Sequence, residues 1–314
     1  MSIALGAPSI WKQRGRGFWQ RLKAQWQLIL MVIPAVVLLF LFCYLPMAGI
    51  QIAWKEYNFG KGILGSPWVG WKYFHFLLRQ DFWLLLRNTV VIAGLKFVFQ
   101  FPAPIILALL LNEVRQARFK RVVQTVTYLP HFLSWVVIVG IIQAFFALDG
   151  GVINSLLRTL GLDPIFLLGD KNLFYPLVVF SSLWKEVGWG CIIYLAAISG
   201  IDPQLYEAAQ IDGAGRWRQM LHITMPCISP VISILLVLSI PGLISAGFDQ
   251  IWLMQNAYNI GISEVIDTYV LRLGLLNSQF SFTAAIGFFT SLVATTLVLV
   301  ANSISRRLGG QTLW

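Results

Sequence analysis

Six long apolar segments recur along the chain, and each is separated from the next by a more polar stretch. A helix that crosses a lipid bilayer needs about 20 mostly apolar residues, and every segment reaches that length. Only 11% of the 314 residues are charged, whereas a soluble domain carries roughly a quarter. The sequence therefore predicts an all-α integral membrane protein with six transmembrane helices, at residues 27–50, 88–111, 122–148, 173–198, 227–247 and 282–301.

Prolines fall inside several of these segments. In a membrane, neighbouring groups can satisfy the backbone carbonyl that a proline leaves without a donor, so the residue is tolerated. It still kinks or breaks the helix locally. We expect such irregularities at Pro34, Pro102, Pro104, Pro130 and Pro241.

Basic residues concentrate between the apolar segments and give the chain a net charge of +10. Taken together, they are more numerous in the N-terminal arm, the loops 112–121 and 199–226 and the C-terminus than in the loops 51–87, 149–172 and 248–281. Because cytoplasmic loops carry the excess of Lys and Arg, we expect both termini in the cytoplasm and the second set of loops outside a bacterial inner membrane. Charge placed in this way argues against nucleic-acid binding.

Residues 1–26 form a separate N-terminal arm. Its bulky side chains fall on one helical face with basic residues between them, at Trp11, Phe18, Trp19, Leu22 and Trp26. That pattern is typical of an amphipathic helix in the membrane interface, and an arm that grips a partner helix is the alternative. The remainder, 27–314, is expected to form a single six-helix transmembrane domain.

The polar loop between the fourth and fifth segments carries the most informative motif. Asp202 before Pro203 predicts a helix start, because aspartate caps a helix and proline suits its first position. A short helix should follow at 205–211 and end at the glycines, and a second short helix at 216–223 should stop at Pro226. Its charged and small side chains would suit docking to another protein. From the residues alone, a docking surface and a solvated connector both remain open.

This loop, residues 201–226, resembles the Glu-Ala-Ala (EAA) loop of ABC importer permeases. Glu207-Ala208-Ala209 is followed by Gly213, Ile223 and Pro226 at that family's spacing, with Met225 in place of its usual leucine. The chain further resembles LplB-type permeases, in the maltose branch that imports oligo- and polysaccharides, at residues 44–47, 62–68, 128–132, 266–270 and 309–314.

The resemblance implies the type I importer permease fold, in which this loop forms a coupling helix held in a cleft of an ATPase subunit. The ATPase contacts would then come from Glu207, Ala208, Ala209, Asp212, Gly213 and Arg216. The implied partners are a second, related permease that completes a heterodimer, an ABC ATPase dimer that uses ATP and Mg²⁺, and an extracellular solute-binding protein that delivers oligosaccharide. The chain itself should bind no cofactor and is not expected to be an enzyme, because it lacks the Gly-x₄-Gly-Lys-Ser/Thr phosphate loop.

Two ionisable residues, Lys185 and Glu186, lie in the middle of the fourth segment. Such residues are costly within a membrane and are functional candidates by default. In the maltose branch, this stretch and the one after the fifth segment contribute sugar contacts, which by resemblance gives substrate-pathway candidates at Ser182, Trp184, Lys185, Glu186, Trp189, Phe248, Asp249 and Trp252. For Lys185 and Glu186, a structural pair between helices is the alternative.

A lysine in the pathway would favour an acidic sugar, such as a uronic-acid oligomer. Lys96, in the second segment, is expected to snorkel or to pair with a neighbour. Two other functions remain open: an importer of the same architecture for another solute class, and a secondary transporter that works without ATP. The sequence shows no clear inverted repeats of the kind that such carriers use, and no metal-ligand spacing.

Overall fold

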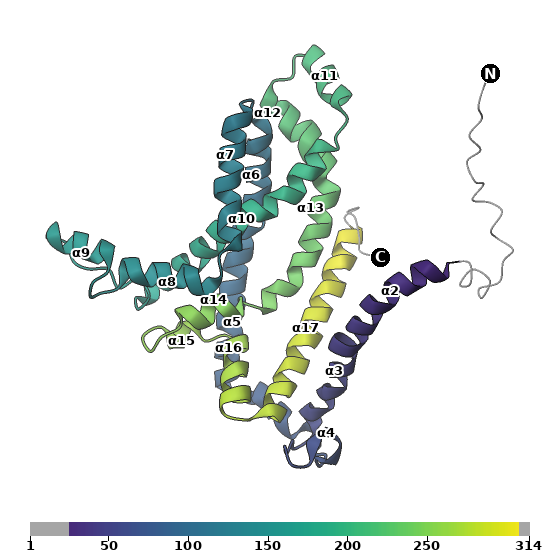
Figure 1. Cartoon of the computed structure of the whole chain (residues 1–314), viewed down its shortest axis with the longest axis vertical. Coiled ribbons are helices and arrows are strands. Elements are labelled where there is room, and N and C mark those ends of the chain that lie inside the picture. The colour runs from purple at the N-terminus through teal and green to yellow at the C-terminus, as the bar shows by residue number, and fades with distance from the viewer. Residues whose placement is uncertain (1–24, 308–314) are drawn as a thin grey trace.

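Residues 25–307 are described in a computed structural model of the chain. Over that range the secondary structure is helical, apart from one isolated bridge between Lys55 and Trp68. Five helices are long and apolar enough to cross a membrane, and a bent pair of helices makes a sixth span. Figure 1 shows these spans as a loose bundle with shorter helices at its ends.

The first three spans and their connections contain α2 (Trp26–Leu39), η2 (Phe40–Tyr44), α3 (Leu45–Met47), η3 (Ala48–Trp54), α4 (Gly62–Gly65), η4 (Gly70–Leu78), α5 (Gln80–Gln100), α6 (Pro102–Glu113), α7 (Ala117–Tyr128), η5 (Leu129–Phe132), α8 (Trp135–Phe146) and α9 (Val152–Thr159). The last three contain α10 (Lys171–Ser199), α11 (Pro203–Ile211), α12 (Arg216–Gln219), η6 (Met220–Thr224), α13 (Met225–Ser239), η7 (Ile240–Ile244), α14 (Phe248–Met254), α15 (Ile260–Ser263), α16 (Ile266–Leu271), η8 (Arg272–Leu276) and α17 (Phe280–Arg307). Each predicted segment coincides with one span, so the all-α six-span prediction is confirmed.

The third span is broken in its middle, as its proline predicts. The helices Ala117–Phe132 and Trp135–Phe146 meet at an angle of 100°. Pro130 opens the tight turn η5 just before the break, because a proline ring disfavours continuation of the preceding helix. Ser134 then starts α8 as its cap, accepting a hydrogen bond from the Val137 N–H at 3.3 Å.

Pro226 does not end a helix, so this part of the sequence prediction is wrong. Helix α12 runs on through η6 and α13 as one continuous span. The turn η6 is π-helical, and the Met225 N–H donates to the Met220 carbonyl five residues earlier. This wider turn accommodates the proline, whose ring would otherwise clash with the carbonyl of the fourth preceding residue. The π-turn η2 precedes Pro46 in the same way.

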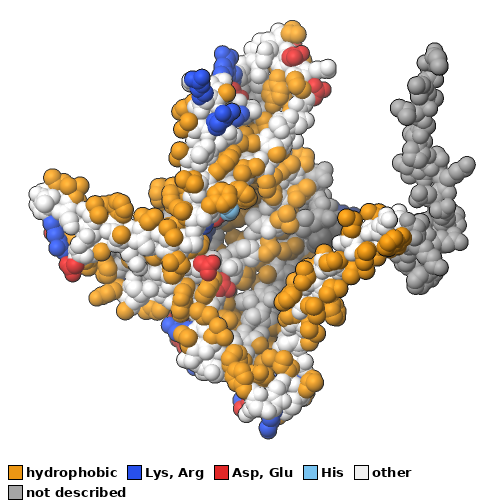
Figure 2. Space-filling view, viewed as in Figure 1, with side chains coloured by type: hydrophobic (Ala, Val, Ile, Leu, Met, Phe, Trp, Pro, Cys, Tyr) orange, Lys and Arg blue, Asp and Glu red, His pale blue; other side chains and the backbone are white. Residues whose placement is uncertain are grey.

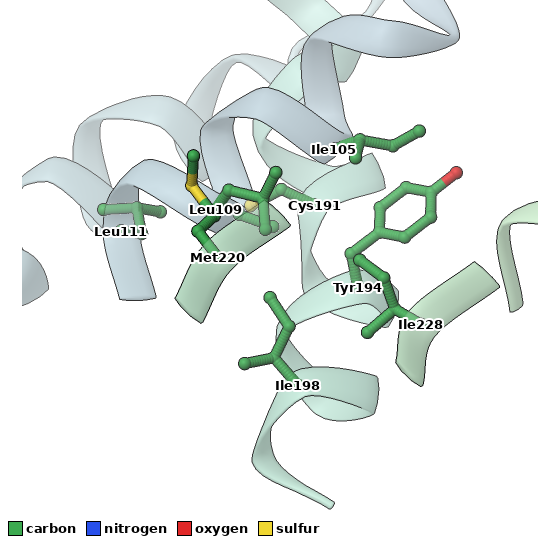
Figure 3. Packing of buried hydrophobic residues seen from close by; sticks show 9 residues of the cluster. Ile105, Leu109, Leu111, Cys191, Tyr194, Ile198, Met220 and Ile228 are labelled. Carbon is green, nitrogen blue, oxygen red and sulfur yellow. The ribbon is translucent and has the colours of Figure 1, made fainter. Parts of the chain in front are cut away.

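Helix α10 lies at the centre of the packing and contacts α5, α6, α7 and α13. Gly188 marks its closest approach to α7, because a Cβ atom at this position would lie 2.0 Å from the Thr127 carbonyl oxygen. A buried apolar cluster joins α10 to α6 and to the fifth span, and Figure 3 shows its side chains converging, among them Ile105, Leu109, Leu111, Cys191, Tyr194, Ile198, Met220 and Ile228.

The first span stands apart from this core. None of the residues of α2 is buried, and Figure 1 shows the helix diverging from α17. The contact between the two is made lower down, where η3 packs against α17. Figure 2 shows that the exposed side chains of α2 are mostly apolar, which suits contact with lipid or with another membrane protein.

The two ends of the bundle differ in charge. The loop that carries α11 and the junction between α6 and α7 lie at one end, and α4 lies at the other (Figure 1). Lys and Arg side chains gather at the first end (Figure 2). The predicted N-terminal arm lies outside the described residues up to residue 24, and so does the stretch 309–314.

Candidate substrate pathway and coupling loop

A cavity of about 390 Å³ lies where α5, α10 and the end of the fifth span meet. Its polar lining consists of Lys96, Gln100, Ser182, Glu186, Ser239, Ser245 and Gln250, and Trp135 at the start of α8 adds an aromatic wall. Small-molecule sites commonly have volumes of about 300–1,000 Å³ and a few polar groups on an apolar surface. The cavity therefore has the size and composition of a site for a small polar solute.

The cavity is built on α5 and α10. The Gln100 amide of α5 donates a hydrogen bond to the Ser182 hydroxyl of α10. The adjacent residue Ser181 accepts a hydrogen bond from the Gln250 amide at 2.9 Å, and the same amide donates to the Val178 carbonyl at 2.8 Å. These bonds join the spans of α5 and α10 to the short helix α14, which holds the base of the cavity in one arrangement.

Gln250 also carries an unusual feature. The residue is 1% exposed, and its Oε1 atom is buried without a hydrogen-bond partner among the described residues. A buried acceptor without a donor is costly, and such atoms are few in folded proteins.

Lys185 is directed at the break in the third span and away from the cavity lining. Its ammonium donates to the carbonyl oxygens of His131 at 2.5 Å and Leu133 at 2.8 Å. Its nitrogen also lies 5.8 Å from the centre of the Trp135 ring. Lys185 thus connects two spans, which is the arrangement described by the structural alternative.

Glu186 faces the cavity and is held by its neighbours. Its Oε2 atom lies 2.9 Å from Nδ1 of His131, and its Oε1 atom lies 3.8 Å from the Lys185 ammonium. The His131 ring in turn stacks on Trp189, with ring centres 4.5 Å apart and an interplanar angle of 3°. The carboxylate is therefore fixed in direction and partly neutralised, while the exposed indole of Trp189 presents an aromatic face.

Lys96 plays a similar part at the end of the fifth span. Its ammonium donates to the carbonyl oxygen of Ala246 at 2.5 Å. Gly247 follows with φ of +85°, a conformation that favours glycine, and a Cβ atom there would lie 3.0 Å from the Lys96 nitrogen. The expectation that Lys96 pairs with a neighbouring element is confirmed.

A second, more open hollow of about 620 Å³ adjoins the cavity and shares Ser245 with it. Phe248 lines this hollow and stacks on Trp252, with ring centres 6.0 Å apart. The Ser245 hydroxyl donates to Asp267 at 2.9 Å. Burial raises the pKa of the Asp267 carboxyl above its ordinary value, and the hydrogen bond from Ser245 acts against that rise.

The structure separates the predicted pathway residues into groups. Ser182 and Glu186 line the cavity, Phe248 lines the adjoining hollow, and Asp249 is exposed on the first turn of α14. Trp184 lies apart from them, in an apolar groove of about 510 Å³ between α8 and α10.

Four polar lining residues were not singled out from the sequence: Gln100, Ser239, Ser245 and Gln250. Uncharged polar residues within apolar segments are common, so nothing in a single sequence distinguishes these four. Only the spatial meeting of α5, α10 and α14 does so.

The loop between the fourth and fifth spans begins as its sequence predicts. The Asp202 side chain accepts a hydrogen bond from the Gln204 N–H at 2.9 Å, and α11 starts at Pro203. Gly213 adopts φ of +76° beyond the end of the helix, and the Ala214 N–H donates to the Ala209 carbonyl at 2.8 Å. This pattern of a left-handed glycine and a long return bond is a common helix ending.

The outer surface of this loop is exposed and mixed in chemistry. Of the predicted coupling residues, Glu207, Ala208, Asp212, Gly213 and Arg216 are exposed and Ala209 is half-buried. Two large apolar side chains accompany them, Ile211 with 87% and Trp217 with 70% exposure. Apolar side chains rimmed by charges are typical of a protein-binding surface. A hydrogen bond of 2.9 Å between Tyr206 and Thr224 fastens α11 to the fifth span.

Comparison with known proteins extends over nearly the whole chain. Residues 100–310 match the family described as binding-protein-dependent transport system inner membrane component. The chain is 44% identical to Protein LplB of Bacillus subtilis, over 98% of this chain and 97% of that protein. It is 45% identical to the polygalacturonan/rhamnogalacturonan transport system permease protein YteP of the same organism, over 96% and 95% of the two chains.

Chains of solved ABC transporter structures are also similar to this chain over nearly its whole length. One similar chain, 39% identical, is in the crystal structure of a bacterial ABC transporter involved in the import of the acidic polysaccharide alginate, with a TM-score of 0.84 over 92% of this chain and 98% of that one. Another, 38% identical, is in the bacterial alginate ABC transporter in complex with alginate pentasaccharide-bound periplasmic protein, with a TM-score of 0.85 over 94% and 99% of the chains.

Proposed function

The chain belongs to the family of inner membrane components of binding-protein-dependent transport systems, and from that premise we propose that it is one of two permease subunits of an ATP-driven ABC importer for oligo- or polysaccharides. The observation that carries this proposal is similarity along nearly the full chain to a polygalacturonan/rhamnogalacturonan permease and to a chain of an alginate importer. Both named substrates are polysaccharides, so the same substrate class is proposed here. An acidic sugar is the narrower form of the proposal.

The proposed pathway runs through the cavity beside α10. Ser182 and Glu186 offer hydrogen-bonding groups to sugar hydroxyls, and the exposed face of Trp189 suits the C–H face of a sugar ring. The adjoining hollow with Phe248 extends this surface. Because one permease forms only half of the pathway, a second, related permease would supply the facing half.

The energy for transport would come from a separate ATPase dimer that binds ATP and Mg²⁺. The exposed loop around Glu207 and Gly213 would dock in a cleft of that subunit, with charges and apolar side chains fixing its register. The chain would thus be a transport subunit without an ATPase site of its own. The end of the bundle that carries this loop would be cytoplasmic, and so would both termini. A solute-binding protein would deliver sugar at the opposite end.

The proposal is tested by reconstitution of the chain in liposomes with its partner permease and ATPase. ATP hydrolysis is measured with and without the binding protein loaded with oligosaccharides. We expect the loaded binding protein to stimulate hydrolysis in the wild type and Glu207→Ala to abolish the stimulation. The control Gln210→Ala, which removes another exposed side chain of α11, should respond like the wild type. Transport that proceeds without the ATPase would show instead that the chain is a carrier.

A further inference from the structure

Two lysines, one from α5 and one from α10, each reach a break in regular helix, which is the bend inside the third span for one and the end of the fifth span before α14 for the other. Lys96 binds the Ala246 carbonyl after the fifth span, and Lys185 binds the His131 and Leu133 carbonyls in the third span. The two side chains are buried, with 8% and 7% exposure. Both breaks border the same cavity, through Trp135 on one side and Gly247 on the other.

A carbonyl at a helix break needs a donor from elsewhere. It loses the N–H of the fourth following residue, and in a membrane no water replaces that partner. A lysine ammonium suits this position, because it offers three donors on a long flexible stem. The two lysines therefore meet a requirement that the breaks themselves create.

The helices that carry the lysines are well supported. Helices α5 and α10 pack against each other, are joined by the Gln100–Ser182 hydrogen bond, and contribute to buried apolar clusters. The broken segments, in contrast, contain irregular backbone next to the cavity. The hydrogen bond from each lysine thus sets the position of a cavity wall relative to the well-packed helices α5 and α10.

We infer that Lys96 and Lys185 are positioning residues, which hold the two broken walls of the cavity against α5 and α10, and that neither lysine pairs with a charge on the substrate. The inference rests on the proposed function, because a sugar that passes through the cavity would sense the position of these walls. It also means that any preference for acidic sugars would come from groups other than these two lysines.

The contacts of the two lysines support this assignment to different degrees. Lys185 donates to two carbonyls at 2.5 and 2.8 Å and forms an ion pair with the Glu186 carboxylate at 3.8 Å, so its charge already has a partner within the chain. Lys96 has one carbonyl, and no carboxylate among the described residues lies within 4.0 Å of it. Lys96 is therefore the residue on which the two roles, positioning and charge recognition, are most sharply distinguished.

Lysine-to-methionine variants test the inference, and the chain offers a matched control. Lys55 is 3% exposed and donates to the Ile63 carbonyl at 2.8 Å, but it does not line the cavity. Lys96→Met, Lys185→Met and Lys55→Met are compared in liposomes with the partner subunits. The readout is the concentration of loaded binding protein that gives half-maximal ATPase stimulation, with one neutral and one uronic-acid oligosaccharide.

We expect Lys96→Met and Lys185→Met to raise this concentration about tenfold for both sugars alike, because each leaves a buried carbonyl without its donor, and Lys55→Met to leave it unchanged. Lys96→Gln, which keeps an N–H donor but no charge, should stay close to the wild type. A loss confined to the uronic-acid sugar, or a Lys96→Gln variant as impaired as Lys96→Met, would mean that Lys96 recognises charge. An equal effect of Lys55→Met, or no effect of the cavity variants, would also overturn the inference.

A second readout is independent of transport. Ser245 borders Ala246, and Ser245→Cys can be labelled with a water-soluble maleimide in a background with Cys43→Ser and Cys227→Ser, since both native thiols are exposed. Lys96→Met should change the labelling rate, and Lys55→Met should not. If no sugar stimulates the wild type, the proposed function fails, while this comparison still decides the role of Lys96.

Discussion

Gly188 is the position where a single added methyl group should do most harm to the site. A Cβ atom there would lie 2.0 Å from the Thr127 carbonyl oxygen, whereas ordinary contact begins at 3.4 Å. In Gly188→Ala, α10 and α7 must therefore separate by about 1.4 Å. The obstacle is backbone, so no side-chain rotation can relieve it.

The displacement should also reach the cavity. Lys185 lies one turn before Gly188, and a shift of this size can lengthen its 2.5 Å contact with the His131 carbonyl to about 3.9 Å, beyond hydrogen-bond range. Overpacking costs about 1–3 kcal/mol, and a buried carbonyl that loses its donor costs about 1–3 kcal/mol. The expected loss of unfolding free energy is thus about 2–6 kcal/mol.

The assay is unfolding of the purified chain in mixed micelles by titration with sodium dodecyl sulfate, followed by tryptophan fluorescence. Gly94→Ala is the matched control, because Gly94 lies in the neighbouring helix α5 with no atom within 4 Å of its added methyl group. That variant should be neutral or slightly stabilised, since alanine favours helix over glycine. A Gly188→Ala protein within about 0.5 kcal/mol of the wild type, the range of neutral surface changes, would refute the close approach of α10 and α7.

Two further predictions concern the coupling loop and the outer hollow. Gly213→Ala places a side chain at φ of +76°, which costs about 1–2 kcal/mol. The affinity of the chain for the ATPase, measured by titration of the reconstituted complex, should therefore fall about fivefold or more. The control Gly215→Ala, at φ of −69°, should bind normally. Asp267 lies outside the candidate spans, and burial raises its pKa above 3.8. The folded state therefore holds this proton more tightly than the unfolded state does. The contribution of Asp267 to stability is largest below pH 3.8 and declines as the pH rises through the raised pKa. Melting curves across that window should show this decline in the wild type and lose it in Asp267→Asn.

The spans were predictable because hydropathy is a property of each segment by itself. The length and hydropathy of an apolar run such as 173–198 indicate by themselves that the segment lies in lipid, whatever the rest of the chain contains. The start of α11 was predictable for a similar reason, since Asp202 and Pro203 act on their immediate neighbours. Even the break after Pro130 follows from local proline geometry.

The failures have a different origin. Pro226 was expected to stop a helix, but a π-turn before it shifts the backbone hydrogen bonds by one residue, and no composition signal marks such a turn. Lys185 was identified by the cost of a charge in a membrane, yet its partners are carbonyls freed by a break more than fifty residues earlier. Gln100 and Gln250 became candidates only when three helices met. Contacts between distant segments decide such features, and a single sequence does not contain them in readable form.

The bend in the third span also has a consequence for biogenesis. Its second helix has 12 residues, which extend about 18 Å, too short to cross a hydrocarbon core of about 30 Å. As the chain leaves the ribosome, the apolar segment 122–148 can enter the bilayer only as one unbent helix. The lysine that stabilises the bent form belongs to α10 and has not yet been synthesised. Membrane insertion and final shape are thus separate events for this helix, and the second waits for the arrival of α10.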